Sequence, residues 1–115
     1  MTFFRKVVSV FCFFFFPGYL LAQKADSIYF NLYTDSLKKG TFNYINVEGR
    51  INRGKILPLS ARDLIFSATT GKFNGNSLFL EPSSTVEKVE ITATLRNDST
   101  KRITTILFVK RLVEN

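Results

Sequence analysis

The chain has 115 residues, with 16 Lys and Arg against 9 Asp and Glu, one Cys and no His. This length supports one small domain, and the moderate positive charge is not the dense basic tract of a nucleic-acid-binding arm. Without His, the chain lacks the usual general base near neutral pH and a principal ligand of zinc. We therefore expect no enzyme, no metal or cofactor site, and no nucleic-acid partner.

Residues 1–22 have the layout of a secretory signal peptide. A positively charged head precedes an apolar run from Val7 to Phe16, Pro17 interrupts the run, and the small Ala22 stands before polar residues. We expect cleavage after Ala22. The mature domain, residues 23–115, would then be exported to the periplasm, the cell surface or the medium.

The alternative is an uncleaved membrane anchor. Residues 7–22 would extend roughly 24 Å as a helix, which is short of the ~30 Å hydrocarbon core, so we favour cleavage. Contact with a membrane is then expected only through a retained leader. Cleavage also removes the single Cys, Cys12. No disulfide is therefore expected in the mature domain.

The mature part shows the two-residue periodicity of β-strands. Val89, Ile91, Ala93 and Leu95 alternate with polar residues, which places one face of a strand in a core and the other in water. Residues 103–109 are dense in β-branched and aromatic side chains, which predicts a strand covered on both faces. We expect strands near residues 26–34, 41–51, 54–58, 62–68, 77–81, 86–96 and 102–112.

The alternation slips between Tyr44 and Ile45. A β-bulge would explain the slip, and so would a strand that crosses from one sheet to another. Turn-forming residues, among them those at 38–40, 70–71 and 74–76, separate the apolar runs. About seven short strands at this spacing predict a single all-β domain with two packed sheets.

A family resemblance rests on Val47-Glu48-Gly49-Arg50, Gly54-Lys55, Pro58-Leu59, Leu64-Ile65-Phe66-Ser67-Ala68, Gly71-Lys72-Phe73, Val89-Glu90-Ile91-Thr92-Ala93-Thr94 and Ile106-Leu107-Phe108-Val109-Lys110. These segments resemble bacterial immunoglobulin-like domains, which occur in exported adhesins and invasin-like proteins. The resemblance implies an immunoglobulin-like β-sandwich that binds and does not catalyse. The spacing from Gly49 to Phe73 is also similar to transthyretin-like or carboxypeptidase-regulatory sandwiches, which differ in strand order.

Basic residues supply the first candidate site. Arg50, Arg53 and Lys55 surround one predicted hairpin, and Arg62 follows soon after. Such a cluster can dock a partner that bears phosphate or carboxylate groups. The simpler interpretation, which we favour, is a solvated loop whose charges keep the domain soluble.

Three tyrosines supply the second candidate site. Tyr29, Tyr33 and Tyr44 would form an aromatic face if their strands are neighbours. Tyrosine offers a flat apolar surface with a polar tip, which suits a sugar ring or another protein. Packing at the edge of the core explains these residues about as well.

Three Asp-Ser pairs supply a candidate modification. Asp26-Ser27-Ile28, Asp35-Ser36-Leu37 and Asp98-Ser99-Thr100 resemble a three-residue acceptor of O-glycans on exported bacterial proteins. O-glycosylation at Ser27, Ser36 or Ser99 is therefore a hypothesis. Ordinary turn chemistry is its alternative.

The sequence thus favours a non-catalytic binding or accessory protein of the bacterial envelope or cell surface. Its expected partner is an envelope or surface protein, or an anionic glycan. The alternative is a structural subunit that assembles through an exposed sheet edge, with Ile106 to Val113 as the pairing strand.

Overall fold

The structure, a computed structural model, describes residues 25–113, and every regular element in this range is a strand. The predicted all-β class is confirmed. The leader and its cleavage site lie outside the described residues and stay predictions. The strands are β1 (Ser27–Phe30), β2 (Ser36–Lys39), β3 (Phe42–Tyr44), β4 (Val47–Ile51), β5 (Lys55–Leu59), β6 (Leu64–Ala68), β7 (Lys72–Asn74), β8 (Ser77–Phe79), β9 (Lys88–Leu95) and β10 (Arg102–Val113).

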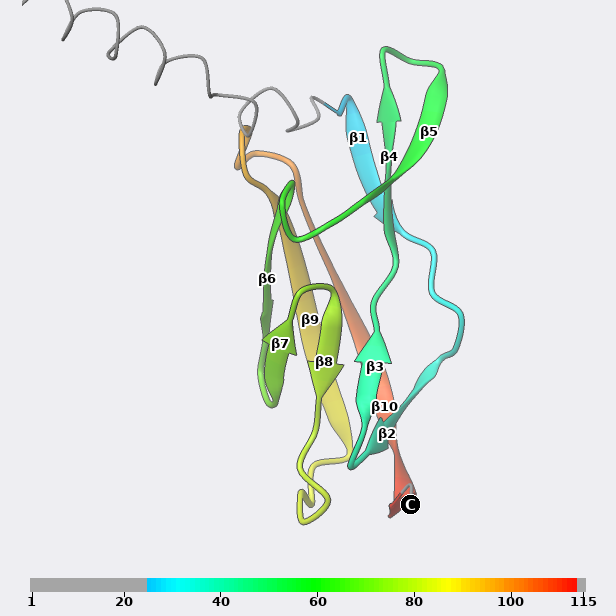
Figure 1. The fold of residues 1–115 in the computed structure, drawn as a ribbon, viewed down its shortest axis with the longest axis vertical. Coiled ribbons are helices and arrows are strands. Elements are labelled where there is room, and N and C mark those ends of the chain that lie inside the picture. Colours follow the sequence, from blue (N-terminus) through cyan, green and yellow to red (C-terminus); the bar gives the residue numbers. More distant parts are fainter. Residues whose placement is uncertain (1–24, 114–115) are drawn as a thin grey trace, which may run out of the picture.

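The strands form three sheets, where the sequence predicted two. One sheet has four strands in the order β2-β10-β9-β6, and the other two have the orders β1-β4-β5 and β3-β8-β7. Neighbouring strands are antiparallel except β2 and β10, which run parallel. Figure 1 shows β1-β4-β5 toward one end of the domain and β3-β8-β7 toward the other.

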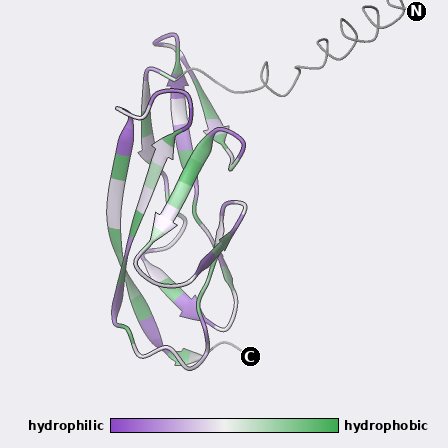
Figure 2. Ribbon diagram, turned by 90° about the vertical axis from the view of Figure 1, so that its left-hand side faces the viewer, coloured by the Kyte–Doolittle hydropathy of each residue, from purple (hydrophilic) through white to green (hydrophobic). Residues whose placement is uncertain are grey.

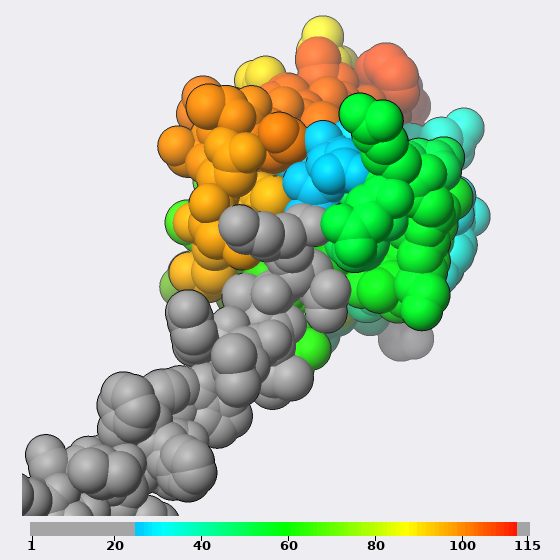
Figure 3. Space-filling view, turned by 90° about the horizontal axis from the view of Figure 1, so that it is seen from above, coloured from blue at the N-terminus to red at the C-terminus, as the bar shows by residue number. Residues whose placement is uncertain are grey.

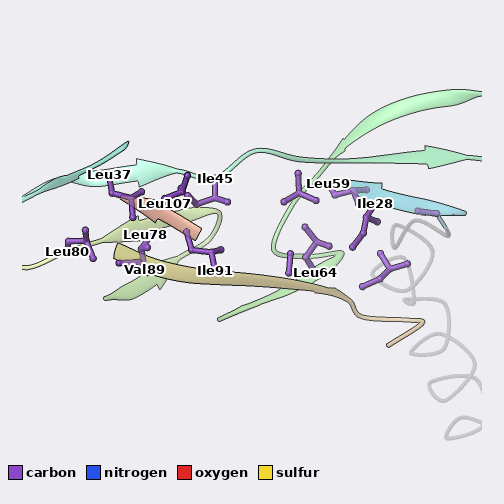
Figure 4. Close-up of a cluster of buried hydrophobic side chains, with 14 residues drawn as sticks. Ile28, Leu37, Ile45, Leu59, Leu64, Leu78, Leu80, Val89, Ile91 and Leu107 are labelled. Carbon is purple, nitrogen blue, oxygen red and sulfur yellow. The ribbon is translucent and has the colours of Figure 1, made fainter. Parts of the chain in front are cut away.

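One hydrophobic core joins the three sheets. The predicted alternation of β9 is confirmed, since Val89, Ile91, Ala93 and Leu95 are all buried, and Figure 2 shows hydrophobic and hydrophilic residues alternating along the strands. In Figure 4 the core side chains lie between β9 and the chain that runs through β3 and β4. The remaining core residues are Ala25, Ile28, Leu37, Ile45, Val47, Leu59, Leu64, Leu78, Leu80 and Leu107.

The phase slip marks a crossing between two sheets. β3 ends at Tyr44 in one three-stranded sheet, and β4 begins at Val47 in the other. Ile45, Asn46 and Val47 are buried in succession, so the chain does not alternate while it crosses. Of the two explanations for the slip, the crossing is confirmed.

Two strands lie in segments that the sequence assigned to turns or left unassigned. β2 includes Lys38 and Lys39, and it forms because Leu37 enters the core and β10 supplies a backbone partner. β7 pairs with β8 across the turn at Gly75, whose φ of 62° suits glycine. These two strands, and the division of the predicted strand at 41–51 into β3 and β4, raise the count in the described residues from seven to ten.

The outer face of β10 corrects another expectation. Ile106 and Phe108 are 54% and 63% exposed, although the sequence predicted a strand covered on both faces. The inward side chains of Leu107 and Val109 pack against the core, but no described segment covers the opposite face of the four-stranded sheet. β10 therefore carries apolar side chains both in the core and on an exposed surface.

Candidate functional site

The most prominent surface feature is a group of aromatic rings, the exposed Tyr33, Phe42 and Tyr44 together with the half-buried Phe79, which we name the aromatic patch. The rings of Tyr33 and Tyr44 stack with centroids 5.9 Å apart and planes 17° apart. Phe42 and Phe79 are cross-strand partners on β3 and β8, with centroids 5.2 Å apart. Tyr33 is 73% exposed, which is high for a residue type of intermediate average burial. Large exposed apolar groups that gather in this way mark interaction sites.

An open cavity of about 270 Å³ adjoins the aromatic patch. Tyr33, Phe42 and Tyr44 line it together with hydroxyl-bearing residues of the same segment and the positively charged Lys38. Aromatic surface, hydroxyl groups and one cation are a combination that binding sites for polar ligands commonly use. The volume suits a single sugar ring or one side chain of a partner protein.

A buried asparagine fixes the strands that carry the aromatic patch. The Asn43 side chain points inward between Phe42 and Tyr44, and its Oδ1 accepts from the Lys38 N–H at 2.8 Å. Its Nδ2 donates to the carbonyls of Lys38 at 3.0 Å and Leu78 at 3.1 Å. Asn43 thus joins β2, β3 and β8, and it holds the cavity walls together. The sequence analysis did not identify this residue. A polar side chain at an inward-facing strand position could have indicated a buried hydrogen-bonding role.

The three tyrosines predicted as one face do not all lie together: Tyr29 is on β1, Tyr33 is in the β1–β2 connection and Tyr44 is on β3. Tyr33 and Tyr44 meet as expected. Tyr29 lies on β1 opposite Glu48 of β4, in the other three-stranded sheet, and it is not among the residues that line the cavity. Phe42 and Phe79 take the place of Tyr29 in the patch, which the sequence analysis did not foresee because the pairing of β3 with β8 is long-range.

Three of the four predicted basic residues lie together. Arg50, Arg53 and Lys55 belong to the β4–β5 hairpin and are exposed, and Arg50 Nη1 donates to the Gly54 carbonyl at 3.4 Å. Arg62 belongs to another element, the β5–β6 connection, which hydrogen-bonds to the end of β9 through Arg96 and the carbonyls of Ala61 and Asp63.

The candidate glycosylation sites differ in accessibility. Ser27 begins β1 and Ser99 lies in the β9–β10 connection, and both are exposed. Ser36 is half-buried at the start of β2, and its hydroxyl donates to Asp35 Oδ1 at 3.2 Å. Glycosylation stays a prediction at all three positions.

The described residues contain neither a candidate metal-ligand group nor a helix that could cross a membrane. Residues 25–113 hold no group of three or more His, Cys, Asp or Glu side chains placed to share a metal ion. The same range holds no helix with the length and apolar character that a membrane crossing needs. No family model, curated protein or solved structure matches the chain.

Proposed function

We propose that this chain is an exported, non-catalytic binding protein of the bacterial envelope or cell surface, and that it acts through an immunoglobulin-like β-sandwich. The leader supports export, and the lack of His supports a role without catalysis. The observation that carries the binding role is the aromatic patch with its adjoining cavity.

The strand order supports an immunoglobulin-like arrangement. Immunoglobulin-type sandwiches place strands C, F and G in one sheet and A, B, E and D in the other. Here β6-β9-β10 has the order C-F-G, and β3-β8-β7 has the order B-E-D. The chain that runs through β3 and β4 takes the place of strand B, with β1 as strand A beside it. A split strand B and the added strand β5 are departures from that plan.

The aromatic patch has the features of a prepared binding surface. Tyr33 and Tyr44 present rings with polar hydroxyls, and Asn43 ties the backbone around them, so little ordering is needed when a partner binds. Lys38 adds a positive charge at the cavity wall. A glycan with acid groups or a surface protein of the envelope fits this chemistry.

Replacing the stacked tyrosines tests the proposal. We expect the double variant Tyr33→Ala, Tyr44→Ala to bind envelope polysaccharides or envelope proteins at least ten-fold less tightly. The dissociation constant is measured with the protein immobilised on a sensor surface and envelope extract fractions in solution. Phe108→Ala is the matched control, because Phe108 is an exposed aromatic residue outside the patch. Unchanged binding by the double variant, or equal loss in the control, would contradict the proposal.

The alternative, a structural subunit, is favoured by one observation. The expected pairing strand, residues 106–113, is a sheet edge only in part, because β10 lies between β9 and β2 and pairs with β2 from Phe108 to Val113. Its side toward β9 has no described strand beside it beyond Val109. Ile106, Phe108 and Leu112 are exposed along this strand. Light scattering at micromolar concentration separates the two functions, since a subunit forms oligomers that Phe108→Lys disrupts, whereas a binding module stays monomeric.

A further inference from the structure

The charges of the described residues are unevenly distributed. We name as the basic end the part built from residues 26–27, residues 50–55 around the turn of the β4–β5 hairpin, the β5–β6 connection, and residues 96–102 between β9 and the start of β10, which Figure 3 shows from above. It holds seven cations and three carboxylates, whereas the rest of residues 25–113 holds six cations and five carboxylates. The basic end therefore carries most of the net positive charge. Its charged residues are Arg50, Arg53, Lys55, Arg62, Arg96, Lys101, Arg102, Asp26, Asp63 and Asp98.

The carboxylates of the basic end already have partners. Asp98 forms an ion pair with Lys101 at 3.2 Å. Asp26 accepts the backbone N–H of Arg53, and buried Asp63 accepts the N–H of Ser60 at 3.1 Å. The ion pair of Asp98 does not involve the hairpin. The guanidinium and ammonium groups of the hairpin are thus available to an anion outside the domain.

The hairpin holds Arg53 at its tip in an unfavourable backbone conformation. Asn52 and Arg53 have φ angles of 48° and 62°, and the Gly54 N–H donates to the Ile51 carbonyl at 3.0 Å. These features define a type I′ turn, whose second central position strongly prefers glycine. A strained non-glycine residue that the surroundings hold in place points to a function for its side chain.

The described chain begins at the same end of the domain. The Asp26 N–H donates to the Arg50 carbonyl at 2.8 Å, so the start of the described chain is fixed beside the hairpin. Four peptide steps separate Ala22 from Asp26, and they span at most ~14 Å when fully extended. An apolar leader held in a membrane would therefore keep the basic end close to the lipid headgroups.

We propose that the basic end docks on anionic lipid headgroups, with Arg50, Arg53 and Lys55 as its principal contacts. This orientation turns β3 and β8, which Figure 1 places toward the other end, away from the membrane. The aromatic patch then stays accessible to a partner. Docking of this kind needs no retained leader, because each cation near an anionic membrane strengthens adsorption about five-fold.

Vesicle binding by the mature chain, residues 23–115, tests the proposal. The core and all three sheets lie within residues 25–113, so this chain contains the complete fold and excludes any contribution from the apolar leader. We expect sedimentation with vesicles of phosphatidylcholine containing about a third phosphatidylglycerol, weak binding to pure phosphatidylcholine, and release by high salt. The variant Arg50→Gln, Arg53→Asn, Lys55→Gln should bind on the order of a hundred-fold less tightly. Asn at position 53 accepts a positive φ, so folding is preserved.

A second triple variant removes the same charge elsewhere. Lys72, Lys88 and Lys110 are exposed and lie outside the basic end, and Lys→Gln at all three should leave vesicle binding nearly intact. Equal losses in both variants, or equal binding to neutral and anionic vesicles, would overturn the proposal. Retention on an immobilised sulfated polysaccharide through the hairpin, without binding to the vesicles, would also overturn it and assign the basic end to a glycan.

Discussion

The four-stranded sheet and the two three-stranded sheets opposite it are stabilised in different ways. In β9 and β10, long strands place alternate side chains in the core, and a regular ladder pairs Arg102 through Phe108 with Thr94 through Lys88. The other side consists of short strands joined through the side chains of buried or half-buried asparagines. Asn46 donates to the Asn31 carbonyl at 3.0 Å, and Asn76 donates to the Leu59 carbonyl at 3.1 Å. One side depends mainly on apolar burial, and the other depends also on particular polar groups.

This difference explains where the domain carries its candidate sites. The four-stranded sheet has regular pairing and a regular surface. On the opposite side the chain crosses from one three-stranded sheet to the other between β3 and β4, and the β4–β5 hairpin has a strained turn. The aromatic patch lies on β3, β8 and the β1–β2 connection, and the basic hairpin is formed by β4 and β5. Both sites lie on the side whose short strands are joined by hydrogen bonds from asparagine side chains to the backbone, which we call polar clamps. Departures from regular strand pairing are possible there.

The largest expected effect comes from breaking the regular sheet. Ile91 is fully buried at the centre of β9, so Ile91→Ala removes apolar contacts and leaves a cavity. We expect a loss of about 3 kcal/mol in the free energy of unfolding, measured by urea denaturation. Glu90→Ala, at the neighbouring exposed position, should change it by less than about 0.5 kcal/mol. Similar losses in the two variants would mean that burial does not dominate this sheet.

Removing the Asn43 hydrogen bonds should lower the free energy of unfolding somewhat less than Ile91→Ala, but it should weaken binding at the aromatic patch more. Asn43→Leu keeps the side-chain size and leaves the N–H of Lys38 and the carbonyls of Lys38 and Leu78 without their partner. We expect a loss of about 2 kcal/mol in urea denaturation, together with weaker binding at the aromatic patch. Asn74→Ala, at an exposed asparagine of β7, is the control. A stable Asn43 variant with full binding would contradict the clamp.

Removing the backbone strain at the tip of the β4–β5 hairpin should stabilise the domain, unlike the two preceding substitutions. Arg53→Gly removes the penalty of a left-handed conformation and should raise the free energy of unfolding by about 1 kcal/mol. The same change at Arg50, within the regular pairing of β4, should lower it. A destabilised Arg53→Gly variant would show that the side chain contributes packing that outweighs its backbone strain.

The smallest effect sharpens the description of the β9–β10 connection. Hydrogen bonds from Thr100, followed by the contact with Lys101, lower the pKa of Asp98 below its ordinary value of 3.8. The stabilisation by this carboxylate is therefore present above pH 3.8 and is lost as the pH falls through the lower folded-state pKa. Thr100→Val should raise the pKa of Asp98 toward 3.8, measured by NMR titration. A pKa of Asp98 that does not respond would remove Thr100 as its main cause.

Local pattern predicted the regular part of the fold well. The alternation from Val89 to Leu95 is enough to identify an inward face, because side chains in a strand alternate whatever its partners are. The phase slip at Tyr44 correctly indicated an irregularity, but the sequence did not choose between a β-bulge and the crossing between sheets that the structure shows. β2 was missed because its single inward residue, Leu37, shows no period, and its parallel partner lies far away in sequence.

The candidate sites could be predicted only in part. The hairpin cluster follows from chain proximity, so Arg50, Arg53 and Lys55 were grouped correctly, whereas Arg62 joins another element. The aromatic patch depends on the pairing of β3 with β8, which no local pattern specifies. The strain at Arg53 was also invisible in the sequence, because a loop of the same composition can adopt several turn types.

The position of β10 has a consequence for the order of folding. This last strand lies between β2 and β9, so the four-stranded sheet stays incomplete until the C-terminal residues are available. During synthesis the growing polypeptide lacks the element that joins its early and late segments, and closure of such distant segments is slow. We therefore expect the four-stranded sheet to close late in folding, because the pairing of Phe108 with Ser36 joins segments that lie far apart in the sequence.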